Sequence, residues 1–470
     1  MKPYYLITGL LLATSSMALA QPAAKSASII DEEILVTADF RQARLFDLGV
    51  SATVLDAETL KQRDAKHLEQ VLNLAPNVNF ASGASRGRFF QIRGIGERSQ
   101  FVEPMNASVG LIVDGIDMTG IGGAATTLDI QQVEVLRGPQ GTLFGANALA
   151  GIINMVSGTP TEAFEAQVVA SLGEHDTQSL EAVASGPMSE TLGYRLAYSN
   201  YQSDGFQENA FLDTDDTADF DEQTLRAKLR WEPNDDWLLE LTGLYVDIDN
   251  GYDGFSLDNT RTTFSDQPGH DRQETLAGSA RLTWRAHQAF NVEALVSRTD
   301  ADLEYGFDED WSFEGFCEAF ECLASSFSSF DNYIRDNENT TTDLRLVSST
   351  GADEMGWVLG AYYRDQTQEL RRVYTFLEDD FLRDYDTQNT ALYGQLDIPL
   401  AERFKLTIGL RYEEREADYE DSDGAAFEPD EDMWGGKLAL EYRAPGGGLW
   451  YALASRGYKA GGVNSDSAVP

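Results

Sequence analysis

The segment that decides the fold is FKLTIGLRYE, residues 404–413. Apolar or aromatic side chains occupy its even positions, and charged, polar or glycine residues occupy its odd positions. Successive side chains of a β-strand point to opposite faces, so this period of two predicts a strand with one apolar and one polar face. The same alternation recurs in LRAKLRW, residues 225–231, and in ARLTWR, residues 280–285. We therefore expect a β-sheet from about residue 163 onward.

A soluble sandwich and a membrane barrel both produce this alternation, because the apolar face meets a core in one and lipid in the other. The expected strands have about ten residues or more, as a tilted membrane crossing requires, whereas soluble strands average about five or six. Short turns lie near residues 233–236, 286–288, 399–403 and 445–448, and long acidic loops lie near 204–221, 248–273, 303–338, 367–386 and 416–432. Long loops on one side only predict a transmembrane antiparallel β-barrel.

Counting strands by this alternation yields about thirteen, the last of them from Leu449 to Lys459. An odd number of antiparallel strands cannot close, and single-chain bacterial barrels use even numbers. An open edge in lipid would leave backbone groups unpaired. We therefore expect the 470 residues to be a fragment or a truncated reading frame.

The chain is strongly acidic, with 78 acidic residues against 35 basic ones and a net charge of −43. A nucleic acid would be repelled, so no nucleic-acid partner is expected. Acidic runs such as residues 213–222 predict solvated loops. This run has Ala218 where a calcium-binding EF-hand loop needs glycine, so it predicts no metal site.

The N-terminus predicts export. A positive start, an apolar stretch at residues 6–13 that is too short to span a bilayer, and a small-x-small ending indicate that residues 1–20 are a signal peptide. No later run of about eighteen apolar residues offers a transmembrane helix. In an exported protein, Cys317 and Cys322 are expected to form a disulfide that pins a loop.

Residues 45–160 predict a compact, glycine-rich α/β unit. A short helix is expected over residues 68–74, ending before Pro76, and buried strands are expected at 110–114 and 132–137. Three motifs follow in order: QIRGIG at 91–96, VGLIVDGI at 109–116 and VEVLRGPQGTLFGANALAGIIN at 133–154. This set, behind an export signal and before a barrel pattern, resembles the plug domain of TonB-dependent receptors.

Two further segments resemble the same family. EILVTA, residues 33–38, is similar to the TonB box, and RGYKAGGVN, residues 456–464, is similar to a barrel motif of the iron-complex branch. The resemblance implies a signal peptide (1–20), a flexible segment with the box (21–44), a plug (45–160) and a partial barrel (161–470). It also implies a 22-stranded barrel around the plug, of which roughly the first half is present. Ala146 and the segment 155–160 depart from the family pattern, which weakens any transfer of ligand identity.

The box must be extended and unpaired to act. A TonB-type energy transducer, driven by its inner-membrane motor, can then add to it edge-on through main-chain hydrogen bonds. The β-branched residues in the box favour an extended backbone. The box residues are Glu33, Ile34, Leu35, Val36, Thr37 and Ala38.

Arginines of the first and third plug motifs are expected to lock the plug. The resemblance implies that Arg93 and Arg137 face glutamates of the barrel wall. Glu413 and Glu441 lie on the polar faces of their expected strands and are the candidate partners. Ion pairs in a wet lumen are modest and reversible, which suits a plug that must be released.

Arginines and phenylalanines flank the first plug motif, where the resemblance implies ligand contacts in the apical plug loops. Cations beside aromatic rings would suit an anionic, ring-bearing ferric siderophore, and packing of plug against barrel is the alternative interpretation. Acidic external loops would repel such an anion at long range unless divalent ions shared with lipopolysaccharide neutralise them. The candidates are Arg86, Arg88, Phe89, Phe90, Arg98 and Phe101.

The resemblance implies energy-coupled uptake of a ferric siderophore across the outer membrane of a Gram-negative bacterium. The alternatives are another cargo, such as cobalamin, a glycan or another metal chelate, and a non-transporting remnant or surface binding protein. No enzyme and no resident cofactor are expected, because the four histidines are scattered and no Ser/His/Asp set appears.

Overall fold

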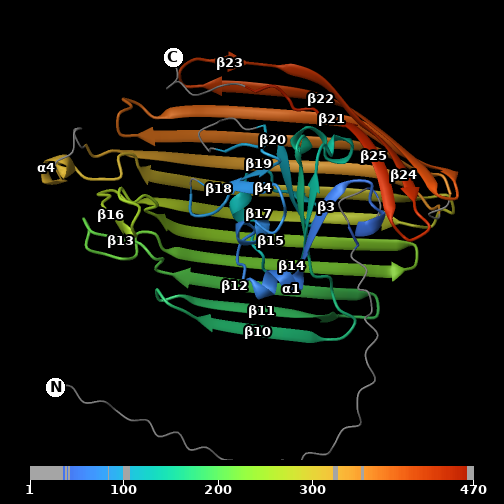
Figure 1. Cartoon of the computed structure of the whole chain (residues 1–470), viewed down its shortest axis with the longest axis horizontal. Coiled ribbons are helices and arrows are strands. Elements are labelled where there is room, and N and C mark those ends of the chain that lie inside the picture. The colour runs from blue at the N-terminus through green and yellow to red at the C-terminus, as the bar shows by residue number, and fades with distance from the viewer. Residues whose placement is uncertain are drawn as a thin grey trace, which may run out of the picture. The chain divides into compact units, whose positions relative to one another are not determined.

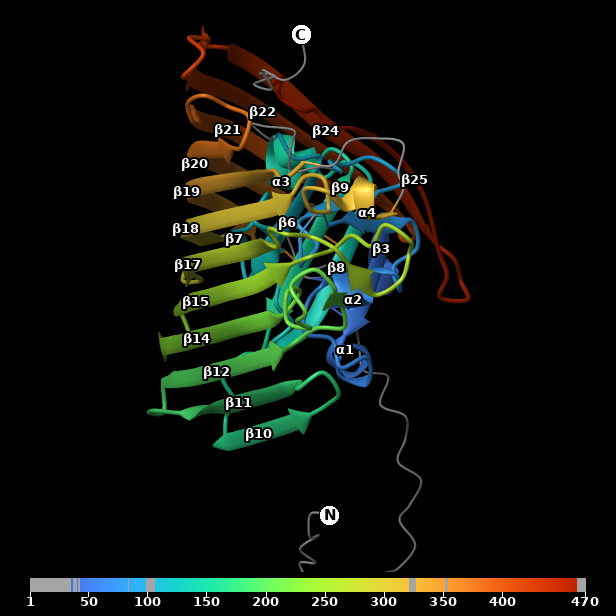
Figure 2. The ribbon, with the colours of Figure 1, turned by 90° about the vertical axis from the view of Figure 1, so that its left-hand side faces the viewer.

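The computed structural model describes residues 35–36, 40, 43–82, 84–98, 106–320, 327–350 and 354–462. The expected signal peptide, Phe101 and Cys322 lie outside these ranges. A small α/β unit, here called the plug, lies against one face of a large antiparallel sheet (Figures 1 and 2). Among the described residues, no helix combines the length and the apolar character needed to span a membrane.

The large sheet has fourteen strands, and thirteen of them follow one another in a single path. The path consists of β10 (Glu165–Leu172), β11 (Gln178–Pro187), β12 (Leu192–Ser203), β14 (Phe220–Asn234), β15 (Trp237–Tyr252), β17 (Gly269–Trp284), β18 (Phe290–Asp308), β19 (Phe330–Ser348), β20 (Gly356–Tyr374), β21 (Phe381–Ala401), β22 (Phe404–Asp421), β24 (Asp430–Arg443) and β25 (Leu449–Arg456). Strand β23 (Ala426–Phe427) pairs with β22 beside this path. Within the described ranges β10 and β25 do not pair with each other, so the sheet is not closed.

Short turns and long loops alternate along most of this sheet as expected. The long loop expected at 367–386 is wrong, because β20 continues to Tyr374 and β21 begins at Phe381, which leaves a short connection at 375–380. The loops before β14, β17, β19 and β24 lie at one end, here called the long-loop end, and the opposite end is called the short-turn end. β13 (Glu208–Asn209) and β16 (Thr262–Thr263) join two of the long loops, and the short helix α4 (Phe316–Phe320) lies in a third. Strand β25 ends at Arg456, three residues before the expected Lys459.

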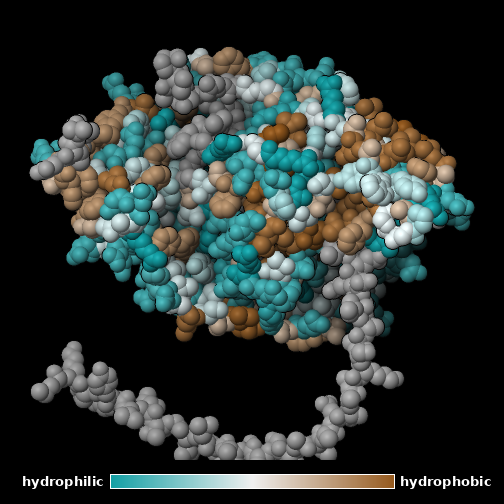
Figure 3. Space-filling view, viewed as in Figure 1, coloured by the Kyte–Doolittle hydropathy of each residue, from teal (hydrophilic) through white to brown (hydrophobic). Residues whose placement is uncertain are grey.

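The alternation in the sequence places polar side chains against the plug and apolar ones outside. In β22, Leu410 is 59% exposed while its neighbour Arg411 is 1% exposed. The expected pattern of apolar-out and polar-in is therefore confirmed. Hydrophobic side chains also gather over β24 and β25 at one edge of the view in Figure 3, where Trp450 is 72% exposed.

The plug is built on a five-stranded sheet in the order β3-β8-β9-β6-β7. Its elements are β1 (Leu35–Val36), β2 (Ala43–Arg44), η1 (Leu45–Asp47), β3 (Ser51–Asp56), α1 (Ala57–Gln62), α2 (Glu69–Leu72), β4 (Val78–Ala81), β5 (Phe89–Ile92), β6 (Val109–Val113), β7 (Ile116–Asp117), η2 (Gly122–Ala124), β8 (Ile130–Arg137), α3 (Gly141–Phe144), η3 (Gly145–Ala148) and β9 (Gly151–Ser157). Helix α1 begins where the Asp56 side chain accepts a hydrogen bond of 2.8 Å from the Thr59 N–H. The expected helix at 68–74 is shorter in the structure, and both expected strands are present as β6 and β8.

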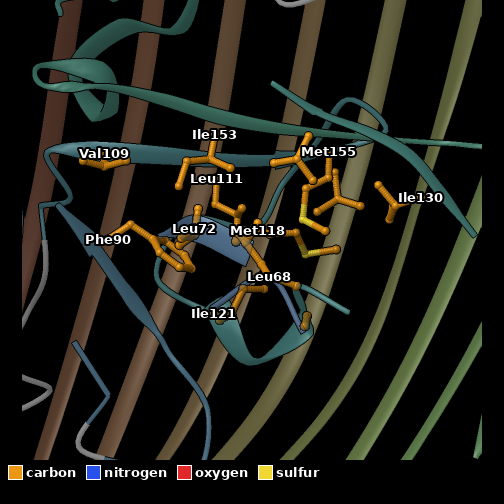
Figure 4. Packing of buried hydrophobic residues seen from close by; sticks show 14 of the residues in the cluster. Leu68, Leu72, Phe90, Val109, Leu111, Met118, Ile121, Ile130, Ile153 and Met155 are labelled. Atoms are coloured by element: carbon orange, nitrogen blue, oxygen red, sulfur yellow. The ribbon is translucent and has the colours of Figure 1, made fainter. Parts of the chain in front are cut away.

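The plug core continues into the wall of the sheet. Leu68 and Leu72 point toward Leu111, Met118 and Ile153 from the plug sheet and its loops (Figure 4). The same buried cluster includes residues of β15, β17 and β18, namely Leu244, Val246, Ile248, Ala277, Ala301 and Leu303. Each large apolar side chain buried in this way contributes about 1.5–3 kcal/mol, so apolar burial helps to seat the plug.

Candidate functional site

Ion pairs hold the apical loop of the plug, residues 84–88, to the wall near the long-loop end. The Arg86 guanidinium donates two hydrogen bonds to Glu222 of β14, at 2.6 and 2.8 Å, and one of 3.3 Å to Glu69. Arg88 donates to Asp271 of β17, which also accepts from the Ser85 N–H at 2.8 Å. The loop is thereby fixed to two wall strands.

This geometry changes the role expected for Arg86 and Arg88. Both are buried, and both are committed to wall carboxylates rather than open to a ligand. Burial would lower the pKa of the Arg86 guanidinium, but the charges and hydrogen bonds of Glu222 and Glu69 together outweigh it and raise the pKa above its ordinary value. The contacts agree with the alternative interpretation of packing between plug and barrel.

The other expected ligand residues are dispersed. Phe89 and Phe90 are buried, and Phe90 belongs to the plug core. Arg98 is exposed, and Phe101 lies outside the described residues. Phe89 lines a small cavity together with Arg88, whereas Phe90 points to the opposite face of β5 and packs in the plug core.

A second group of ion pairs lies midway along the wall. Asp114, in the turn between β6 and β7, accepts hydrogen bonds from Arg226 at 2.7 Å and from Lys228 at 2.8 Å. Burial would raise the pKa of Asp114, but the charges of Arg226 and Lys228 outweigh it and hold the pKa at about 2. Nearer the short-turn end, Asp129 of the plug accepts two bonds from Arg195, at 2.7 and 2.5 Å.

The expected pairing of Arg93 and Arg137 with Glu413 and Glu441 is wrong. Arg93 is exposed, and Arg137 donates within the plug, to the carbonyl of Pro76 at 2.8 Å and to the hydroxyl of Thr53 at 2.6 Å. Burial lowers the pKa of Arg137, and the nearby charge of Arg93 adds to this effect.

The two glutamates do face the plug, but they have other partners. Glu413 pairs with Arg411 at 2.8 Å and accepts a hydrogen bond of 2.8 Å from the Tyr458 hydroxyl. It also lies close to Gly145 of the plug, where an added Cβ would come within 2.6 Å of the Glu413 carboxylate. Glu441 pairs with Lys405 at 2.8 Å. Sequence alone could place these glutamates on the inner face, but could not select their partners.

A cation–aromatic wall lies near the long-loop end and consists of Tyr333, Arg335, Arg372 and Tyr374. The Arg372 guanidinium is 5.1 Å from the ring centres of both tyrosines, and Arg335 is 4.9 Å from that of Tyr333. Tyr333 and Arg372 are direct partners in the register of β19 and β20. Asp331 orients Arg372 through two bonds of 2.9 and 2.8 Å.

Sequence reasoning missed this wall, although a signal was present. YIR at 333–335 and RVY at 372–374 each place tyrosine and arginine two residues apart. In a strand such residues share a face, and the polar face of this sheet points inward. Tyr333 and Arg335 are buried, whereas Arg372 and Tyr374 are partly exposed, so these two can offer a cation and a π-face to an anion that carries rings.

Comparison with known proteins decides the family. Residues 185–469 match the family described as "TonB dependent receptor-like, beta-barrel", and residues 44–152 match the "TonB-dependent Receptor Plug Domain". The chain belongs to the TonB-dependent receptors. This confirms the resemblance drawn from the plug motifs and the alternating strands.

Two curated relatives of this receptor are named for what they bind or transport. The pesticin receptor of Yersinia pestis is 24% identical over 454 residues, which cover 92% of this chain and 64% of that protein. The vitamin B12 transporter BtuB of Vibrio vulnificus strain YJ016 is 26% identical over 312 residues, covering 64% of this chain and 46% of that protein.

Solved structures share the fold of the receptor. The ferric yersiniabactin uptake receptor FyuA from Yersinia pestis has a TM-score of 0.75 at 21% identity, covering 87% of this chain and 65% of that one. The siderophore receptor PiuA from Acinetobacter baumannii has a TM-score of 0.72 at 16% identity, covering 88% and 65%. The receptor chain therefore spans somewhat less than two thirds of the length of these relatives.

The described part of the expected TonB box is paired in this structure. Of the expected box, only Leu35 and Val36 are described, and they pair antiparallel with Ala43 and Arg44. Val36 is 0% exposed, and Phe40 is buried and stacks on Tyr393 at 5.4 Å between ring centres. The expectation of an unpaired strand is wrong for Leu35 and Val36, and the rest of the box lies outside the described residues.

Two small cavities lie between the plug and strands β18–β22. The cavity beside Arg88 and Thr119 has a volume of about 40 Å³, and the one beside Asn106 and Asn389 has about 30 Å³. Such volumes hold only a few waters, since one water needs about 10–15 Å³. Cys317 lies in α4, and its expected disulfide with Cys322 stays a prediction because Cys322 lies outside the described residues.

Proposed function

We propose that the receptor takes up a ferric siderophore across the outer membrane in an energy-coupled step. The observation that carries the proposal is the cation–aromatic wall, which lies toward the long-loop end of a plug that ion pairs attach to the sheet. The wall would bind an anionic, ring-bearing iron chelate from the long-loop side. Iron enters in this proposal as part of the cargo and not as a resident cofactor.

The closed plug implies that binding alone cannot move the cargo through. Work must release the ion pairs of Arg86, Arg88 and Asp114 with the wall. A TonB-type transducer would supply that work by pairing with the box after the β1–β2 hairpin opens. Relatives named for siderophore uptake support this cargo class, and a relative named for vitamin B12 supports cobalamin as the competing cargo.

Uptake by cells that carry the native-length receptor tests the cargo. We expect radiolabelled ferric siderophore to accumulate in iron-starved cells, and an uncoupler of the proton gradient to stop accumulation while leaving surface binding intact. Accumulation of labelled cobalamin without iron would favour the competing cargo. Surface binding without any uptake would instead indicate a binding protein that does not transport.

A proline in the box tests the coupling. Val36→Pro removes a backbone donor that a transducer strand would use. We expect uptake to fall to background while the affinity for cargo at the surface is unchanged. Wild-type uptake in this variant would show that the box plays no part in energy transfer.

A further inference from the structure

A buried histidine lies next to the carboxylate that holds the apical loop. His67 precedes helix α2 and is 1% exposed. Backbone hydrogen bonds fix the chain on both sides of it, because the Leu68 N–H donates to the Ala125 carbonyl at 3.0 Å and the Thr127 N–H donates to the Lys66 carbonyl at 3.0 Å. The ring therefore cannot turn out into water unless the structure around it moves.

Both ring nitrogens of His67 have partners that suit the neutral ring. Nε2 lies 2.9 Å from the carbonyl oxygen of Gly122, which can only accept, so this nitrogen carries the hydrogen. Nδ1 lies 3.4 Å from the backbone nitrogen of Glu69, whose N–H can only donate, so Nδ1 serves as an unprotonated acceptor. A second proton on the ring would set two donors against each other.

Glu69 connects this ring to the apical loop. Its carboxylate accepts hydrogen bonds from the Gly87 N–H and, at 3.3 Å, from the Arg86 guanidinium. The same carboxylate lies 3.8 Å from Nδ1 of His67. A protonated ring would compete with the loop for Glu69, and its charge would repel Arg86.

The charged groups that act on His67 come from three elements: Glu69 from α2, Arg86 from the apical loop and Glu222 from β14. Burial lowers the pKa of His67 below its ordinary value, Arg86 adds to this effect, and the two glutamates oppose it without overcoming it. Release of the loop would hydrate the ring and return its pKa toward the ordinary value. The released form therefore binds a proton more tightly than the docked form.

We propose that His67 makes the apical loop a pH-sensitive latch, which is docked on the wall while the ring is neutral and released when acid protonates it. The docked form keeps its full stability above the ordinary histidine pKa of about 6.5 and loses stability as the pH falls below it. A single proton is taken up, so the ratio of released to docked form changes by at most about tenfold per pH unit. The latch does not depend on the uptake function proposed above.

Hydrogen–deuterium exchange measures the release of the loop. The native-length receptor in detergent micelles is labelled at several pH values between about 7.5 and 5.5, and exchange is read in a peptide that spans residues 84–90. His67→Gln keeps a donor toward Gly122 and removes the titrating group. The ratio of wild-type to His67→Gln exchange cancels the intrinsic pH dependence, and we expect it to be flat above about pH 7 and to rise several-fold toward about pH 5.5.

His287→Gln is the matched control, because His287 is exposed in a short turn. This variant should keep the pH dependence of the wild-type apical peptide. A peptide from the plug sheet, residues 130–137, reports on opening of the whole plug and should not follow the apical peptide. A ratio that stays constant across the pH range, or a parallel rise in the plug-sheet peptide, would overturn the latch.

A second readout needs no variant at position 67. Deuterium exchange at the imidazole C2 carbon, followed by mass spectrometry on the wild-type receptor, measures the pKa of His67 directly. We expect a value below about 6.5, with slow exchange because the ring is buried. A value at or above about 6.5 would refute the proposal, even if His67→Gln did not fold.

Discussion

Asp114 of the plug carries a negative charge that joins the plug to two cations of the wall. It accepts hydrogen bonds from Arg226 and Lys228 of the wall and from the Ser157 N–H at 2.9 Å within the plug. Asp114→Asn would leave Arg226 buried without its counter-charge. Breaking a buried ion pair costs about 3–5 kcal/mol, so we expect a lower free energy of unfolding in detergent. Asp235→Asn, in an exposed short turn, is the control and should change little.

The pH dependence of this contribution has a defined sign. The pKa of Asp114 is about 2 in the folded protein against an ordinary value of 3.8. A depressed carboxyl pKa stabilises the fold fully above the unfolded value, and the stabilisation is lost as pH falls through the folded value. The difference in unfolding free energy between wild type and Asp114→Asn should thus be constant from pH 7 to about 4, and should shrink toward pH 2. A difference that changes near neutral pH would contradict this assignment.

Arg372 is the residue that defines the cation–aromatic wall. Arg372→Gln removes the cation between Tyr333 and Tyr374. Charge-assisted contacts contribute about 1.5–3 kcal/mol, so the Kd for the cargo should rise by about tenfold or more. The neighbouring Arg371→Gln is the matched control, because Arg371 is on the outer face and pairs with Asp380. Equal effects of both substitutions on surface binding would show that the cation–aromatic wall is not part of the cargo-binding site.

At the scale of elements, the pairing of β1 with β2 occupies the backbone of Leu35 and Val36, which a transducer strand would need in the proposed coupling step. Phe40 anchors it by stacking on Tyr393, and Phe40→Ala would remove that anchor. Truncating a buried phenylalanine costs about 3–5 kcal/mol, so limited proteolysis near residue 40 should quicken on the order of a hundredfold. Phe46→Ala changes a side chain that is 85% exposed and should leave the cleavage rate as it is. Unchanged cleavage in Phe40→Ala would show that other contacts hold the hairpin.

The segment after β25 is a second element that joins plug and wall. Tyr458 reaches Glu413, and Lys459 donates to Glu97 of the plug at 2.7 Å. Gly457 allows this path, because an added Cβ would lie 2.9 Å from Pro139 and Leu149. The segment RGYKAGG, residues 456–462, thus leaves the sheet toward the plug, where the sequence predicted a strand that continues to Lys459.

At the scale of the whole molecule, the two outer strands of the large sheet decide how it can enter a membrane. Within the described ranges β10 and β25 each pair on one side only. Unpaired backbone groups in lipid cost several kcal/mol each. We therefore expect the 470-residue chain, expressed alone, not to insert as a folded monomer, as measured by heat-modifiable migration in gels. A heat-modifiable, protease-resistant monomer would contradict this expectation.

Much of the architecture could be predicted from local patterns. The alternation around Leu410 and Arg411 predicted the strands and their faces, because side-chain direction in a strand depends only on position along it. Turn and loop lengths predicted which strand ends lie together. Loop chemistry was less informative, since the acidic runs do not specify what their residues contact.

The pairings in the candidate site depended on the tertiary structure. The sequence determined that this receptor has a plug and an inward polar face, and that Glu413 and Glu441 belong to that face. Only the fold decided that Arg86 binds Glu222 and that Arg137 bonds within the plug. The wall partners of Arg86, Arg88 and Asp114 are more than a hundred positions away in the sequence, so their choice depends on strand register and plug position, which no local pattern encodes.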